Sequence, residues 1–224
     1  MAFGSPGSVG SFADRAHAGR VLAEHVAGRL GRLGPPAPMV VAVPRGGVPV
    51  GAAVARLLGG GLMVMPVGKV GAPGHEELAV GAVAPGGVTV LNQGIIAALN
   101  LPADLVDELV RRAVEKLVRQ EQAYREGRPP PPPLRGRCAV VVDDGLATGA
   151  SMRAALTAVR RGHPERVVLA VPVAPPEVLA GLAPLVDEHV CPVQPAHMEA
   201  VGAWYEDFSQ TSDEEVLSCL DGMA

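Results

Sequence analysis

The spacing of hydrophobic residues changes along the chain and predicts where helices and strands alternate. Residues 14–33 carry apolar side chains at helical intervals, so we expect an amphipathic helix that ends at the following glycine and prolines. Apolar runs at 39–43 and 62–67 have the length of buried strands, and a loop and a small-residue helix at 48–58 lie between them. Strand, loop, helix and strand in this order predict a right-handed βαβ unit.

The middle of the chain departs from this alternation. Two β-prone runs, 79–83 and 88–91, flank an Ala-Pro-Gly-Gly turn, which predicts a β-hairpin that reaches off the main sheet. A long charged helix with one apolar face is expected at about 101–126. Five consecutive prolines at 129–133 then predict a stiff, extended surface spacer that carries the chain back to the core.

The alternation of strands and helices returns in the last third of the chain and predicts an α/β fold. Ser212 and Glu215 have the spacing of a capping box for a final helix at 213–220. The expected strands of this part are 139–142, 166–173 and 186–190, and the expected helices are 150–161 and 176–182.

The 224 residues are expected to form a single domain. Hydrophobic residues make up 48% of the chain and aromatic residues only 3%, so Val, Ala and Leu must fill the core. The domain is expected to have a core at about 12–70 and 134–192, an insertion of hairpin and long helix at about 71–133, and a C-terminal hood at 193–224.

Composition also argues against two classes of binding partner, nucleic acids and membranes. A net charge of −4 argues against general nucleic-acid binding, which depends mainly on neutralising phosphates. The chain has no apolar run of membrane-spanning length and no apolar signal region at its start, so we expect no membrane partner. Three widely spaced cysteines without metal-ligand spacing predict reduced thiols in a cytoplasmic protein.

The candidate chemistry is concentrated where an apolar strand meets the next helix. Asp143 and Asp144 close the strand, and a loop of small residues with Thr148 and Ser151 leads into the helix. Open α/β sheets bind ligands at the carboxyl ends of their strands, and a helix amino-terminus with free N–H groups binds phosphate. The two carboxylates are suited to sugar hydroxyls, Mg²⁺ or both. An exposed acidic turn and an ordinary helix N-cap are the alternative interpretations.

Residues 143–151, Asp-Asp-Gly-Leu-Ala-Thr-Gly-Ala-Ser, resemble the phosphoribosyl pyrophosphate (PRPP) signature of type I phosphoribosyltransferases. Residues 43–48 resemble the family's pyrophosphate loop, and residues 69–83 lie where the family keeps a mobile catalytic loop. Residues 12–20 resemble the first helix of one bacterial branch of the family, and the tail at 201–208 extends the resemblance over nearly the whole chain. The resemblance implies a parallel sheet flanked by helices on both faces, a hood and a protruding hairpin.

The resemblance also implies a role for each motif. Asp143 and Asp144 would be catalytic and would bind the ribose hydroxyls and, directly or through water, Mg²⁺. Lys69 would stabilise the departing pyrophosphate, although a solvated lysine is the alternative interpretation; His75, Glu76 and Glu77, which follow it, are left without an assigned role. The pyrophosphate would lie on Arg45, Gly46 and Gly47, and the 5′-phosphate on Ala147, Thr148, Gly149, Ala150 and Ser151.

The residue types of the pyrophosphate loop fit this role. Gly46 and Gly47 permit a close backbone approach, and the guanidinium group of Arg45 matches phosphate oxygens. A plain strand-to-helix turn is the alternative, and the family resemblance places a non-proline cis peptide near Arg45. Asp14 is expected to cap the first helix, and Arg15 is expected to be a solvated charge.

The acceptor side of the predicted site is the least defined by sequence. Trp204 and Tyr205, with Phe208, make up half of the six aromatic residues. They either pack the tail onto the body or form a wall that stacks on an acceptor base. The resemblance places Ala147 where 6-oxopurine members of the family have an acidic residue, which argues against that acceptor class.

The sequence thus predicts a homodimeric phosphoribosyltransferase that moves ribose-5-phosphate from PRPP to an unidentified nitrogenous acceptor. Mg²⁺ is the expected cofactor, and PRPP and a small-molecule acceptor are the expected ligands. Two alternatives stay open at this point: a non-catalytic sensor of PRPP or nucleotides, and a phosphohydrolase that acts on sugar phosphates.

Overall fold

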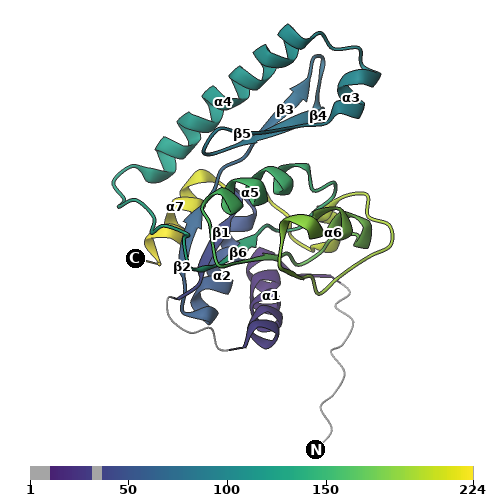
Figure 1. Ribbon diagram of the computed structural model, residues 1–224. Coiled ribbons are helices and arrows are strands. Elements are labelled where there is room, and N and C mark those ends of the chain that lie inside the picture. Colours follow the sequence, from purple (N-terminus) through teal and green to yellow (C-terminus); the bar gives the residue numbers. More distant parts are fainter. Residues whose placement is uncertain (1–10, 32–36, 224) are drawn as a thin grey trace, which may run out of the picture.

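The structure is a computed structural model that describes residues 11–31 and 37–223. Within these residues, the body of the molecule is a five-stranded sheet in which every pairing is parallel (Figure 1). In spatial order, its strands are β2 (Gly61–Val64), β1 (Met39–Ala42), β6 (Cys138–Val142), β7 (Arg166–Ala170) and β8 (Glu188–Val190). The parallel α/β body expected from the sequence is confirmed.

Helices cover both faces of this sheet because successive strand residues point to opposite sides. One face packs on α1 (Arg15–Leu30) and α2 (Gly47–Leu58), and the other on α5 (Ala150–Arg161) and α6 (Pro176–Leu182). The buried residues of the central strands show the alternation: Val40, Val140 and Val142 on the first face, and Val41, Val141 and Leu169 on the second. The predicted end of the first helix falls mostly on residues outside the described ranges.

Substitution of Leu156 in α5 measures how much the core between the helices and the sheet contributes to the free energy of unfolding. Its side chain is fully buried against the sheet. We expect Leu156→Ala to lower the free energy of unfolding by about 2–5 kcal/mol, because the cavity left behind cannot fully collapse. Urea unfolding followed by circular dichroism measures the change. Leu57→Ala is the matched control, because Leu57 is 55% exposed and should change stability by less than about 0.5 kcal/mol.

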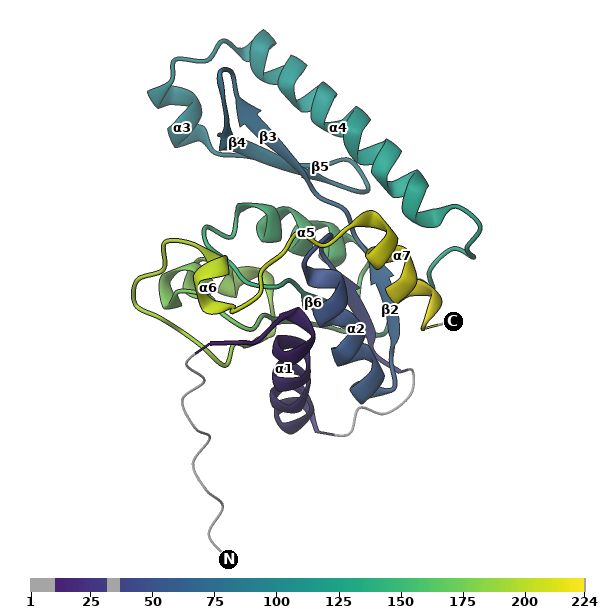
Figure 2. The ribbon, with the colours of Figure 1, turned by 180° about the vertical axis from the view of Figure 1, so that it is seen from behind.

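An arm built on a second sheet stands beside the body (Figures 1 and 2). The sheet is antiparallel and consists of β3 (Gly68–Ala72), β4 (His75–Ala84) and β5 (Val88–Leu91). The short helix α3 (Gln93–Ala98) and the long helix α4 (Ala103–Arg125) complete the arm. Buried residues of β3 and β4 pack on α4, and small residues of β4 pack on Ala154 of α5.

The expected β4–β5 hairpin is confirmed, and most of the segment at 69–83, where the resemblance placed a mobile catalytic loop, is strand; its mobility and catalytic role stay predictions. It forms the paired strands β3 and β4 with a turn at Pro73 and Gly74. Val70 and Val80 face α4 from these strands, which gives them a buried side that a loop would lack. The glycines and the proline of this stretch masked its alternating pattern.

The tail crosses the body and joins the start of the chain. It contains the short helix η2 (Val201–Trp204) and the final helix α7 (Asp213–Asp221), whose predicted capping box from Ser212 and Glu215 is present. Phe12 pairs with the tail through two backbone hydrogen bonds of 2.8 Å, one to Trp204 and one from Glu206. Helix α7 then lies beside α2 (Figure 2). In the described part of the chain, no helix combines the length and the apolar character needed to cross a bilayer.

Candidate active site

The Gly-Gly loop and the paired aspartates meet at the carboxyl edge of the parallel sheet. Ala42 at the end of β1 lies opposite Val142 at the end of β6, so the residues that follow both strands emerge side by side. A Cβ added to Gly46 would lie 1.9 Å from Oδ2 of Asp144, and one added to Gly47 would lie 2.8 Å from Cα of Asp143. Only glycine therefore allows this loop to approach the aspartates so closely.

The peptide bond between Pro44 and Arg45 is cis, as the family resemblance led us to expect. It lies directly before the two glycines, and α2 begins at Gly47. The structure thus brings Arg45, Gly46 and Gly47 to the same place as Asp143 and Asp144.

The two carboxyl groups are largely buried, and burial disfavours their ionised forms. Oδ1 of Asp143 accepts a hydrogen bond of 2.8 Å from the backbone N–H of Asp144. Burial raises the pKa of Asp143 well above its usual range, and the neighbouring charge of Asp144 raises it further. Burial also raises the pKa of Asp144, although the hydrogen bond from Arg15 opposes this change. A cation or a hydrogen-bonding ligand at this point would relieve the repulsion.

The carboxylates fit a Mg²⁺ ion that takes most of its ligands from elsewhere. No cluster of three or more His, Cys, Asp or Glu side chains among residues 11–31 and 37–223 has the arrangement of a metal site. Mg²⁺ is commonly held by one or two carboxylates together with waters and substrate phosphates. Asp143 and Asp144 can supply the protein's share of such a shell.

Arg15 lies within the candidate site and is not the solvated charge that the sequence predicted. Its Nε lies 2.7 Å from Oδ2 of Asp144, and its side chain is 13% exposed, so the expectation of a solvated charge is wrong. Asp14 caps α1 as predicted, accepting a hydrogen bond of 2.6 Å from the backbone N–H of His17. One signal was present in the sequence: a cation in the first turn of a helix opposes the helix dipole and needs a compensating partner.

Tyr205 ties the tail to the acid pair. Its hydroxyl donates a hydrogen bond of 2.5 Å to the backbone oxygen of Asp144, and its ring packs between Phe12 and Phe208. Burial, with a smaller effect of the Asp144 charge, raises the pKa of Tyr205, so the phenol stays protonated. Tyr205 is 7% exposed and therefore packs the tail onto the body, which leaves the partly exposed Trp204 as the candidate for an acceptor wall.

The loop after the aspartates leads into α5 with an open helix terminus. Gly149 is the N-cap residue and has a left-handed backbone with φ of 71°, where a side chain would also crowd Val178. In the described chain, no side chain makes the N-cap hydrogen bond of α5, so the ordinary cap proposed for Thr148 or Ser151 is not observed. Ala147 and Thr148 are exposed, and the first backbone N–H groups of α5 are available to an anion.

Lys69 is carried by the arm and not by the parallel sheet. It lies on β3 in register with Ala82 of β4, and its side chain is exposed. His75 begins β4 and is also exposed, whereas the side chains of Glu76 and Glu77 fall outside what the structure describes. The catalytic role of Lys69 stays a prediction.

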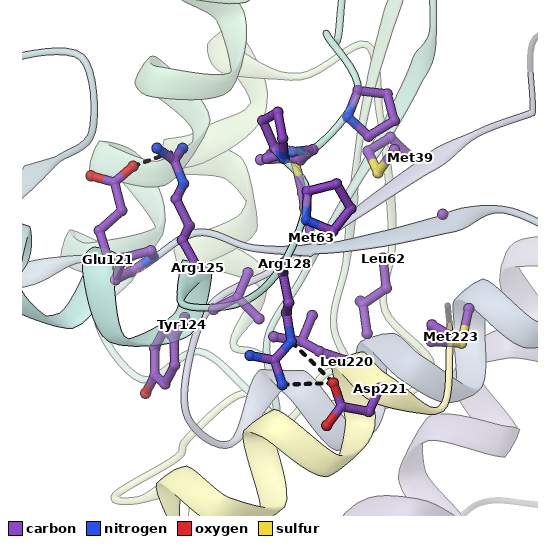
Figure 3. Close-up of a pocket in the computed structure, with 17 residues that line it drawn as sticks. Met39, Leu62, Met63, Glu121, Tyr124, Arg125, Arg128, Leu220, Asp221 and Met223 are labelled. Carbon is purple, nitrogen blue, oxygen red and sulfur yellow. Dashed lines mark hydrogen bonds and ion pairs between the residues drawn. The ribbon is translucent and has the colours of Figure 1, made fainter.

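A pocket of about 300 Å³ lies apart from this acid pair, along the outer edge of β2 (Figure 3). Prolines of the 129–133 run line it together with Leu62, Met63 and Tyr124. The prolines lie beside the edge strand without donating backbone hydrogen bonds, since proline has no N–H. The charged side chains that line this pocket pair with one another, since Arg128 binds Asp221 and Arg125 binds Glu121.

Comparisons with known proteins agree with this geometry. Residues 20–180 match the protein family described as "Phosphoribosyl transferase domain". Over 210 residues the chain is 44% identical to curated proteins from two strains of Mycobacterium tuberculosis, whose names assign them provisionally to the phosphoribosyl transferases. The alignment covers 94% of this chain and 46% of each relative, so the chain spans about half the length of these relatives.

Solved structures show the same arrangement of elements. The crystal structure of TT1426 from Thermus thermophilus is 45% identical, has a TM-score of 0.78, and matches over 96% of this chain and 99% of that one. AQ2163 from Aquifex aeolicus is 15% identical, with a TM-score of 0.51 over 92% of this chain and 86% of that one, which shows a likeness of fold alone.

The parallel sheet, the acid pair at its carboxyl edge and the adjoining antiparallel arm define a type I phosphoribosyltransferase fold. With the match over residues 20–180, the chain belongs to the phosphoribosyltransferase family.

Proposed function

We propose that the protein transfers the ribose-5-phosphate unit of PRPP to a nitrogen nucleophile and releases pyrophosphate. The observation that supports this proposal is the close approach of Gly46 to Asp144, which brings a loop suited to phosphate beside a carboxylate suited to sugar hydroxyls. The uncapped start of α5 lies directly after the same aspartates and offers N–H groups to the 5′-phosphate. Loop, acid pair and helix terminus together match the three polar parts of PRPP.

In the proposed reaction a C1′–N bond forms, the C1′–O bond to pyrophosphate breaks, and the acceptor nitrogen loses its proton. The transition state has oxocarbenium character, as in glycoside cleavage. Asp143 and Asp144 would hold the ribose hydroxyls and offset positive charge near C1′. Arg45 and the backbone of Gly46 and Gly47 would receive the departing pyrophosphate. Bound Mg²⁺ would supply charge neutralisation of the pyrophosphate oxygens.

An assay of pyrophosphate release tests the proposal. The protein is mixed with PRPP, Mg²⁺ and, in turn, each of a panel of purines, pyrimidines and other nitrogen bases. We expect pyrophosphate release that depends on one class of acceptor. The Asp144→Asn variant is the control and should release no pyrophosphate. Release without any acceptor would indicate a phosphohydrolase, and tight binding of PRPP without turnover would indicate a sensor. Absence of PRPP binding to the unaltered protein would contradict the proposal.

A further inference from the structure

The guanidinium group of Arg15 joins three segments that are distant in sequence. Its Nε donates to Oδ2 of Asp144 at 2.7 Å, and its Nη1 donates to the backbone oxygen of Ser209 at 2.5 Å. Its central carbon lies 3.9 Å from the centroid of the Phe208 ring. The start of α1, the acid pair and the tail therefore meet at one side chain.

This arrangement is costly for the helix and for the charge. Arg15 is the first residue of α1, where the helix dipole disfavours a cation, and the first turn contains no acidic residue. A charge that is only 13% exposed also requires a partner to offset its lost hydration. The contacts of Arg15 offset both costs, so the position is explained by what the side chain holds and not by the helix.

Arg15 makes its hydrogen bond to one carboxylate oxygen of Asp144, Oδ2, and not to the other, Oδ1. Oδ2 lies between Arg15 and the backbone of Gly46, where even an added Cβ would not fit. The hydrogen bond from Arg15 is made to Oδ2, so Arg15 does not occupy Oδ1 of Asp144. Oδ1 is therefore the oxygen that a ligand can reach without displacing Arg15.

The other contacts of Arg15 do not depend on Asp144. The hydrogen bond to Ser209 and the stack on Phe208 hold the guanidinium group from the side of the tail. A sugar that binds through Oδ1 does not compete with these contacts. Arg15 can therefore keep its place while the site is occupied.

We propose that Arg15 is a positioning residue, which holds the Asp144 carboxylate with Oδ1 directed to the sugar of PRPP and fixes the tail to that carboxylate. The inference rests on the proposed function. In this role, the start of the first helix and the aromatic tail together hold the Asp144 carboxylate in place. The Gly-Gly loop and the acid pair do not do this alone. The guanidinium fork is needed because one group must donate in two directions and stack on a ring.

Calorimetric titration with Mg²⁺ and PRPP tests this role in three variants of the full chain. Arg15→Ala is expected to weaken binding by about 10–100-fold, the usual cost of removing a group that orients a ligating side chain. Arg15→Lys should recover part of the loss, because an ammonium group keeps the charge but not the fork. Arg20→Ala is the matched control, since Arg20 lies on the same helix with an exposed side chain, and its binding should be unchanged.

Chemical rescue separates positioning from a general effect on folding. Guanidinium chloride at a few tens of millimolar, on the order of a hundredth of denaturing concentrations, should strengthen PRPP binding to Arg15→Ala and leave the unaltered protein unchanged. If Arg15→Ala does not fold, Arg15→Lys decides: native circular dichroism with several-fold weaker binding supports the role, and binding equal to the unaltered protein overturns it.

The outcomes also distinguish this inference from the proposed function. If the unaltered protein binds PRPP and Arg15→Ala binds it equally well or more tightly, the positioning role alone is overturned. If the unaltered protein does not bind PRPP at all, the proposed function fails and the inference fails with it.

Discussion

Replacing Asp143 with asparagine is expected to make the protein more resistant to heat and, at the same time, to remove PRPP-dependent turnover. Asparagine has the same shape and keeps an oxygen that can accept the backbone hydrogen bond from Asp144. It lacks the charge, which burial and the neighbouring carboxylate make unfavourable in the folded protein. The variant therefore loses a destabilising group without losing a packing contact.

The pH dependence of this gain follows from the direction of the pKa change. Below the ordinary carboxylate pKa of about 4, Asp143 is protonated in the folded and unfolded states, and its burial costs little. As the pH rises from that value to the raised pKa of the folded protein, the unfolded chain ionises first and the stability of the unaltered protein falls. The Asp143→Asn variant does not share this fall, so its advantage in melting temperature grows as the pH rises above about 4.

Melting curves from acidic to neutral pH and pyrophosphate assays at one pH check both halves of the prediction. Turnover should fall by roughly 10²-fold or more, the size seen when one electrostatic group is removed from a reacting centre. Asp144→Asn is the comparison: it should lose turnover as well, but gain less stability, because it leaves Arg15 without its counter-charge. Equal melting temperatures for Asp143→Asn and the unaltered protein at all pH values would contradict the proposed cost.

A second large effect is expected from a single methyl group at Gly46. A Cβ at this position would lie 1.9 Å from Oδ2 and 2.6 Å from Cγ of Asp144, far inside contact distance. In Gly46→Ala the carboxylate must turn away, and the ion pair with Arg15 must lengthen or break. Turnover should fall by roughly 10²-fold, since displacements of about 1 Å in a catalytic group have effects of this size.

Gly28→Ala provides the matched control for the substitution at Gly46. Gly28 lies inside α1, and a Cβ added there meets no atom within 4 Å. Alanine at this site should raise stability by about 0.5–1 kcal/mol through its higher helix propensity and leave turnover unchanged. Parallel measurement of turnover and urea unfolding in both variants would show whether the effect at Gly46 arises from crowding of Asp144.

Elements with continuous apolar runs were predicted well from the sequence. The strands ending at Ala42 and Val142 are buried on both faces and show this character residue by residue, so their order and their loops could be placed. Strand β3 was missed because its sequence, Gly-Lys-Val-Gly-Ala, alternates small residues with a lysine and becomes apolar on one side only through contact with α4. Such tertiary contact leaves little trace in the local pattern.

In the candidate site, too, the residues in local motifs were predicted from the sequence, and the residue placed by long-range contacts was not. The aspartates and the Gly-Gly loop were found because each motif has its chemistry within a few adjacent residues. Arg15 was not found, because its partners Asp144 and Ser209 lie 129 and 194 positions away in the chain. No local pattern encodes a contact of that range, and only the unfavourable helix position of the arginine pointed to it.

The contact between Arg15 and Ser209 also determines when the site can exist during synthesis. The two residues are 194 positions apart, so the arginine leaves the ribosome long before its partner is translated. Contacts of such long range form late, because the intervening loop must first be closed by other structure. A nascent chain with both aspartates already folded into β6 and its loop would still lack this link, and the site would be complete only after Ser209 has been translated.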